Sequence, residues 1–445
     1  MSETASQADD EAGDNGPMAR FWAWLAASDP RLFVVLIAAL YVLFTALSFM
    51  AGFQEVGRIL SQLQRVTFFA VLYAMLALAL NLQYGYAGLL NLGVAGFMAV
   101  GVYTMAILSS SPSATVPGLG LPLWIGIPGG FLAASLLGAL AALPAIRLKA
   151  DYLAIVTLAF GEITRLTIRS QRASEFTIAG RTVGTGGTDA IALPTSPVKH
   201  LLYQNPEQPA FVAADSPTVI GEPLFAAGEA VGASPAAVEG IVYTVLLAVI
   251  AGLFYWLLLR IGNSPFGRVL KAIREDELVA SSLGKDTRQF KIKTFALGCG
   301  LMGLVSILWY LGQGSVTPSS FEPQVTFFVF VALILGGSGS NTGSVVGGLI
   351  FASVLLRGPQ FIQRVIGANF DIPETPPDTI FDAFEGIDPF LAYFISDVSI
   401  SAFRFILLGV VLIYLMQRRP DGLLGARTET AAGVDLFERE GGEKR

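Results

Sequence analysis

The sequence contains repeated apolar runs that are long enough to cross a lipid bilayer. A helix needs about 20 such residues to cross the roughly 30 Å of hydrocarbon. Eight runs meet or approach this length, at 32–53, 66–83, 86–109, 123–146, 151–169, 241–259, 291–312 and 402–416. Two shorter runs, 325–335 and 345–356, flank a glycine-rich segment. The pattern predicts an all-α polytopic membrane protein with about 8–10 transmembrane helices, some broken or re-entrant at glycine-rich segments.

Composition excludes several classes of function. Only 14% of residues are charged, against about 25% in soluble domains, and the net charge of −6 argues against a nucleic-acid partner. The single cysteine, Cys299, cannot form an internal disulfide or a thiolate metal cluster. The single histidine, His200, excludes a His-pair metal site and argues against a Ser-His-Asp triad. No GxxxxGK[ST] motif for phosphate binding is present. We therefore expect no catalytic residues, no metal and no cofactor in this chain, and no enzymatic activity of its own.

The distribution of basic residues predicts the orientation. With the N-terminus inside, the inner segments hold eighteen of the 28 Lys and Arg residues and the outer segments hold seven. Positive loops stay in the cytoplasm, so both termini of this multi-pass protein are expected on the cytoplasmic side of the cell membrane. The acidic N-terminus lacks the basic region of a cleavable signal peptide.

These spans divide the chain into five regions. The ends are an acidic, disordered cytoplasmic tail and a second cytoplasmic tail, and an extracytoplasmic insertion separates two transmembrane halves. The C-terminal half contains a further extracytoplasmic loop, 357–401. In chain order the regions are the acidic tail 1–31, the N-terminal transmembrane half 32–169, the insertion 170–240, the C-terminal transmembrane half 241–416 and the C-terminal tail 417–445.

Two glycine-rich segments interrupt the spans. In Gly85–Thr104 the glycines indicate either close helix packing, because small residues let backbones approach, or a broken helix that lines a polar path. Leu333–Gly348 is consistent with two half-helices joined at a turn, or with a simple cytoplasmic turn. Polar groups inside a membrane must face protein or water. We therefore predict that the pathway is lined by Asn81, Tyr84, Tyr86, Asn91, Ser338, Ser340 and Asn341.

A helix is predicted between the sixth and seventh spans, over Asn263–Asp286. Phe266, Val269, Leu270 and Ile273 form an apolar stripe opposite charged residues. Ser264 with Pro265 is a typical helix start, and Gly284 a typical stop. Such a helix could lie on the anionic inner leaflet or dock into a groove of a protein partner. The acidic residues that follow its basic ones favour the protein partner.

Five segments, read together, resemble the branched-chain amino acid permease family of ABC importers. In order they are GYAGLLNLGVAGFMAVGVYT, RLKADYLAIVTLAFGEITR, GTGGTDAI, GRVLKAIREDELVASSLG and LILGGSGSNTGSVVGG. The resemblance extends from about residue 66 to residue 420. It is closest to the M-type permeases, which have a longer external loop after RLKADYLAIVTL.

The resemblance implies a complex and a set of coupling residues. The expected partners are membrane lipid, a second homologous permease, two cytoplasmic ATP-binding subunits and an extracytoplasmic solute-binding protein. The segment that contacts the ATPases corresponds to Phe266, Arg268, Ile273, Arg274, Glu275, Ala280 and Gly284. The family's Glu-Ala-Ala-x-x-x-Gly pattern is incomplete here, because Leu278 and Val279 stand where its first two residues would be.

The implied substrate is a branched-chain or other small hydrophobic amino acid. Permeases for urea or short-chain amides are similar and remain an alternative. An ion-coupled secondary transporter would share the broken helices. It would require carboxylates deep within the spans, whereas Asp151 and Glu162 lie near span ends.

Overall fold

The computed structural model describes residues 29–145, 150–178, 180–205, 217–369, 379–384, 386, 389–390, 392–393, 397–418 and 421–424. The chain divides into two compact units, Met1–Ala46 and Leu47–Arg445. Helix α2 (Asp29–Met50) contributes most of its length to the first unit. The predicted acidic tail up to residue 28, and the C-terminal tail from residue 425, lie outside the described residues.

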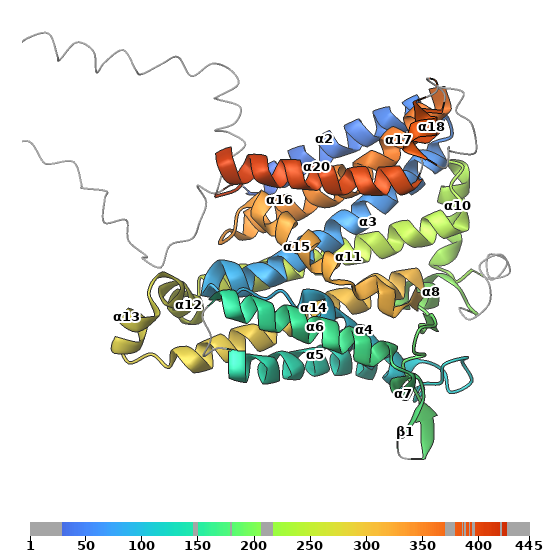
Figure 1. Cartoon of the computed structure of the whole chain (residues 1–445). Helices are drawn as coiled ribbons and strands as arrows, with labels where there is room; N and C mark the ends of the chain where they lie inside the picture. Colours follow the sequence, from blue (N-terminus) through green and yellow to red (C-terminus); the bar gives the residue numbers. More distant parts are fainter. Residues whose placement is uncertain are drawn as a thin grey trace, which may run out of the picture. The chain divides into compact units, whose positions relative to one another are not determined.

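The unit Leu47–Arg445 is built mainly from long helices that run alongside one another (Figure 1). Their bounds are α3 (Val56–Leu80), α4 (Val94–Ser109), α5 (Leu123–Ala145), α6 (Ala150–Arg169), α11 (Pro235–Gly262), α14 (Thr287–Gln313), α15 (Pro323–Gly336), α16 (Asn341–Ile350), α17 (Gly358–Asn369) and α20 (Asp397–Arg418). Two π-helical turns, η1 (Asn81–Gly85) and η3 (Phe351–Arg357), extend α3 and join α16 to α17. Short helices α12 (Pro265–Glu275) and α13 (Glu277–Ser282) lie at one end of these helices (Figure 1).

Each of the ten predicted spans contains a helix. In the described part of the chain, six helices are long and apolar enough to cross a membrane, and the helices over Val94–Ser109, Pro323–Gly336 and Ala402–Leu415 are shorter apolar ones. Helix α6 is 20 residues long and carries a Glu162–Arg165 ion pair. The predicted class, an all-α polytopic membrane protein, is confirmed.

Helix α3 is the centre of the packing. Its second half is apolar around its circumference and nearly all buried, as expected for a helix surrounded by other helices. Its neighbours are α11, α14, α15 and α16. Glycines permit the closest crossings: a Cβ at Gly348 of α16 would lie 2.5 Å from the Ala74 backbone of α3. The predicted packing glycines behave likewise, since a Cβ at Gly96 would lie 2.5 Å from Gly161 Cα.

Other helices expose apolar stripes. On α5, Leu132, Leu136 and Leu140 recur at four-residue spacing and are exposed, as Val245 and Val249 are on α11. In water such stripes would be unfavourable, whereas lipid tails solvate them. These stripes are the expected lipid-facing surface of the protein.

Three sequence predictions are wrong in detail. The span predicted at 86–109 begins as a helix only at Val94. The run 345–356 is not a half-helix, because α16, η3 and α17 form one continuous helical segment of 29 residues, Asn341–Asn369. The segment 357–401, predicted as a loop, therefore begins as helix. The helical segment widens into a π turn at Phe351–Arg357 and continues through Pro359, which has no N–H to donate to residue 355.

The insertion 170–240 is a set of short elements. It contains α7 (Gln171–Ser174), the hairpin of β1 (Phe176–Ile178) and β2 (Arg181–Val183), β3 (Ile191–Ala192), α8 (Pro197–Leu202) and α10 (Gly221–Ala230). Strand β3 pairs with β4 (Ser315–Val316), which follows α14 and precedes the 3-10 turn η2 (Pro318–Phe321). Helix α18 (Ile380–Ala383) lies in the later loop. Residues 206–216 and 370–378 of these two regions lie outside the described part.

Candidate coupling and pathway site

The segment predicted as one helix over Asn263–Asp286 is two helices, α12 and α13. Ser264 caps α12 as predicted, because its hydroxyl accepts a hydrogen bond from the Gly267 N–H. The chain then leaves helical geometry at Asp276, whose carboxylate accepts from the backbone N–H groups of Leu278 and Val279 and so caps α13. Gly284 ends the second helix with a φ of +77°, as predicted.

Three contacts join this pair of helices to the transmembrane helices. Phe266 stacks on Phe290 of α14 with 5.2 Å between ring centroids. The Glu277 carboxylate accepts a 2.5 Å charged hydrogen bond from Lys291, also of α14. Arg274 donates to the backbone carbonyl of Gly85 at the end of η1. We call α12 and α13 together the coupling unit.

The coupling unit presents an apolar surface on its other side. Leu278 is 78% exposed and Leu283 is 74% exposed, although both are large apolar residues. A groove of about 310 Å³ lies beside them, lined by Pro265, Arg268, Val269, Ala272, Ala280, Leu283 and Lys285. Because this surface is apolar at its centre and charged at its rim, it is suited to contact with a protein.

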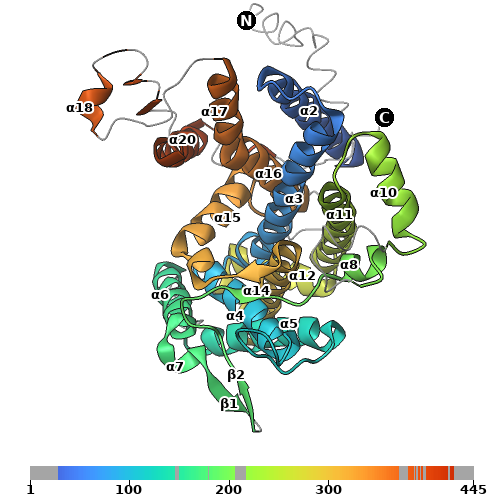
Figure 2. The ribbon, with the colours of Figure 1, turned by 90° about the vertical axis from the view of Figure 1, so that its right-hand side faces the viewer.

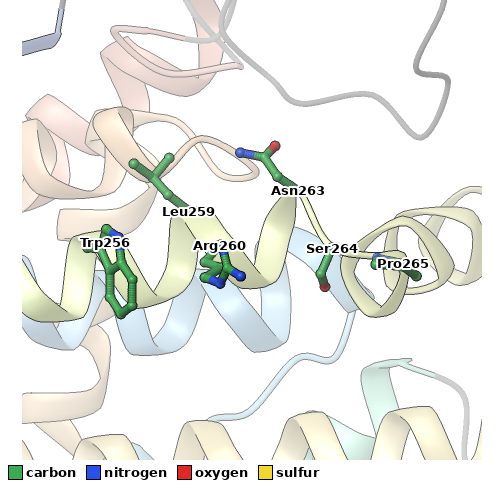
Figure 3. Close-up of a pocket in the computed structure, with 6 residues that line it drawn as sticks. All are labelled: Trp256, Leu259, Arg260, Asn263, Ser264 and Pro265. Carbon is green, nitrogen blue, oxygen red and sulfur yellow. The ribbon is translucent and has the colours of Figure 1, made fainter.

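A pocket of about 450 Å³ lies at the junction of α11 and α12 (Figure 3). It is lined by Trp256, Leu259, Arg260, Asn263, Ser264 and Pro265. Trp256 and Arg260 lie one turn apart near the end of α11, a combination typical of a membrane–water boundary. The coupling unit therefore begins where the α11 span ends.

The chain between η1 and α4 is a break in the helix, which is one of the two alternatives for the glycine-rich segment Gly85–Thr104. Near the end of this break, backbone N–H groups are satisfied by side chains from other helices: Leu92 donates to Thr157 of α6, and Ala95, in the first turn of α4, donates to Thr326 of α15. Asn91 accepts from the Gly93 N–H and donates to Gln83. Non-helical backbone at membrane depth has to be satisfied by protein in this way.

The π turn η1, which precedes the break, is joined to the glycine-rich turn between α15 and α16. Asn81 accepts a 2.8 Å hydrogen bond from the Gly339 N–H and donates to Asn341. Gly85 leaves no room for a side chain, since a Cβ would lie 1.9 Å from Asn81 Oδ1. Hydrogen bonds therefore connect the coupling unit to η1, through Arg274 and Gly85, and connect η1 to the second glycine-rich turn, through Asn81.

Residues 62–370 match the family model described as "Branched-chain amino acid transport system / permease component". The chain belongs to this family. No solved structure matches the chain.

Relatives of the permease family come from bacteria and an archaeon. The high-affinity branched-chain amino acid transport system permease protein LivM of Escherichia coli (strain K12) is 33% identical over 66% of this chain and 62% of its own length. The probable LivM permease of Methanocaldococcus jannaschii is 28% identical over 67% of this chain and 83% of its own. The LivH permease of Salmonella typhimurium is 31% identical over 29% of this chain and 41% of its own. The chain thus spans less than two thirds of the enterobacterial LivM proteins.

The structure distributes the predicted coupling residues between two roles. Arg268, Glu275 and Gly284 are exposed, and Ala280 lines the groove. Ile273 is buried and Phe266 stacks on Phe290 of α14, so these two residues pack the coupling unit against the transmembrane helices. Sequence reasoning did not select the exposed Leu278, Val279 and Leu283 as contact residues. Asp276 was the missed signal, because an Asp followed by helix-forming residues is typical of a helix start.

The predicted lining residues are mostly inside the protein. Tyr84 and Ser338 are half-buried, whereas the other five are buried: Asn81, Tyr86, Asn91, Ser340 and Asn341. Their hydrogen bonds stabilise the break, as described for Asn81 and Asn91. In this structure they do not line an open pathway. Their role as pathway lining stays a prediction and would require a different arrangement of the helices. Among the described residues, no group of His, Cys, Asp and Glu could hold a metal ion.

Proposed function

We propose that this chain is the permease subunit of an ATP-driven importer in the cell membrane and that it moves branched-chain amino acids. The family match and the names of the relatives support this function and the choice of substrate. The observation that carries the mechanism is the coupling unit, which joins an exposed apolar surface to the break between η1 and α4. A surface of this kind, outside the lipid, is suited to a motor protein.

The proposed partners follow from this role. One of two ATPase subunits binds the groove of the coupling unit, and a solute-binding protein delivers substrate at the opposite end of the spans. A second permease completes the pathway, and the LivH similarity supports a homologous partner of that kind. Both termini and the coupling unit lie in the cytoplasm, in agreement with the Lys and Arg distribution.

The hydrogen bonds give a route from ATP to the pathway. When the ATPases close, they displace α12 and α13, and Arg274 transmits the displacement to Gly85. The break moves more readily than a continuous helix because it has no helical hydrogen-bond ladder of its own. Asn81 then carries the movement to the turn at Gly339. A pathway whose lining binds the substrate weakly suits this function. The solute-binding protein supplies the affinity, and a tight binding site within the pathway would slow release of the substrate.

ATP-dependent leucine uptake tests the proposal. Leu283→Glu adds a charge at an exposed site, so folding and membrane insertion should be unchanged while uptake falls at least tenfold. Val219→Glu, at a residue that is 90% exposed in the insertion, is the matched control and should transport normally. Normal leucine uptake by Leu283→Glu would contradict the coupling assignment.

A further inference from the structure

Four arginines from different helical segments gather at one site. They are Arg65 of α3, Arg357 of η3, Arg364 of α17 and Arg404 of α20, and η3 contacts each of the other three segments. Arg65, Arg364 and Arg404 lie close enough to Arg357 for their positive charges to repel it. Among the described residues, none of the four forms an ion pair with a carboxylate. We call this group the arginine cluster.

Neutral groups are the partners of the arginine cluster within the chain. Arg357 donates to Gln360 at 2.9 Å and its guanidinium lies 3.9 Å from the centre of the Phe69 ring. Arg364 donates to Gln62 at 2.8 Å. The Nε atoms of Arg357 and Arg404 are buried and have no hydrogen-bond partner in the described chain. Arg357 and Arg404 are half-buried, whereas Arg65 and Arg364 are exposed. Partly buried charge that has no anionic partner is costly and marks a functional site within a membrane protein.

An apolar groove of about 520 Å³ begins beside Arg404. It lies between α15 and α20 and is lined by Gln324, Phe327, Phe328, Val331, Phe405, Leu408, Gly409, Leu412 and Ile413. The Arg404 guanidinium lies 5.6 Å from the Phe328 ring centre and 5.4 Å from that of Phe405. Figure 2 shows α15, α16, α17 and α20 gathered on one side of α3. The groove therefore has a cationic head and an apolar body.

We propose that the arginine cluster and this groove bind one anionic phospholipid. The phosphate is hydrogen-bonded by Arg404 and Arg357, whose planar guanidinium groups match phosphate oxygens. One acyl chain lies in the groove along Phe328 and Gly409. Charge complementarity selects this ligand, because a zwitterionic lipid brings no net charge to offset four arginines. The exposed apolar residues at the groove rim, Phe327 and Ile413, face the surface where lipid is available.

Native mass spectrometry and thermal unfolding of the purified full-length chain in detergent test the proposal. Added phosphatidylglycerol should stay bound and raise the melting temperature by several degrees. Phosphatidylcholine with the same acyl chains, and inorganic phosphate, should do neither. An equal effect of phosphatidylcholine would overturn the anionic selectivity, and an equal effect of inorganic phosphate would show a site for an anion without the lipid tail.

Two variants address the head and the body of the site separately. Arg404→Gln should retain at least tenfold less phosphatidylglycerol, whereas Arg58→Gln, at an exposed arginine already paired with Glu55, should retain the normal amount. Gly409→Leu fills the groove, since an added Cβ there meets nothing within 4 Å, and should also lose the lipid. Gly252→Leu on α11 has equally open surroundings and is its control. Normal lipid retention in Gly409→Leu would overturn the proposal even if Arg404→Gln failed to fold.

Discussion

The break between η1 and α4 and the arginine cluster are both polar regions within the helices, but they differ in how their polar groups are satisfied. At η1 and the break that follows it, Asn81, Gln83 and Asn91 find partners in the chain itself, among backbone N–H groups, a backbone carbonyl and other side-chain amides. The one exception beside them is Asn341 Nδ2, which has no hydrogen-bond partner among the described residues. In the arginine cluster, like charges lie together and two buried Nε atoms have no partner. Internal satisfaction indicates a structural joint, whereas a deficit indicates a place for a ligand.

The largest effect is expected at the break. Asn81→Leu removes the acceptor of the Gly339 N–H and the partner of Asn341, and leaves buried groups unsatisfied. Each such group costs about 1–3 kcal/mol, so the free energy of unfolding should fall by about 2–6 kcal/mol for the two groups. Thermal unfolding in detergent measures this loss. Thr164→Val is the control, because Thr164 bonds only a carbonyl of its own helix, and equal stability of the two variants would remove the structural role of Asn81.

A smaller effect, of opposite sign, is expected in the arginine cluster. Arg65 is repelled by Arg364, and replacing it with Gln removes that repulsion. In lipid-free detergent the free energy of unfolding of Arg65→Gln should stay unchanged or rise by up to about 1 kcal/mol, since solvent screens a partly exposed charge. Denaturant or thermal unfolding measures the change. A fall in the free energy of unfolding as large as that of Asn81→Leu would mean that the arginine cluster is satisfied by partners within the chain. The difference drawn between the cluster and the break would then be wrong.

The smallest effect is expected for an arginine that has a carboxylate partner in water. Arg58 and Glu55 form a 2.7 Å ion pair with both side chains 65% exposed. Exposed pairs contribute about 0–1 kcal/mol, so the melting temperature of Arg58→Gln should differ little from that of the parent chain, with or without phosphatidylglycerol. A lipid-dependent difference at this position would show that the lipid response does not depend on the arginine cluster.

Much of the fold could be predicted from the sequence because hydrocarbon imposes a length and a polarity on every span. The ten apolar runs and the stop at Gly284 follow from rules that act within one segment. The continuation of the helix through 341–369 could not be predicted, because it depends on a π turn at Phe351–Arg357 and on packing against α3.

The candidate site was only partly predictable for the same reason. The polar character of Asn81 and Asn91 pointed to a special region, but their partners Gly339 and Gln83 are set by the tertiary fold. The arginine cluster gave no sequence pattern, since its members come from segments that lie as many as 339 positions apart, from Arg65 to Arg404. Folding alone brings these charges together.

Site-directed labelling of the coupling unit tests the central claim most directly. Leu283→Cys places a thiol on the exposed surface, and the native thiol of Cys299 is buried and does not compete. A membrane-impermeant maleimide should label Leu283→Cys only after the cell membrane is opened, and co-expressed ATPase subunits should protect it. Labelling in intact cells, with no protection by the ATPases, would contradict a cytoplasmic coupling unit and the importer built on it.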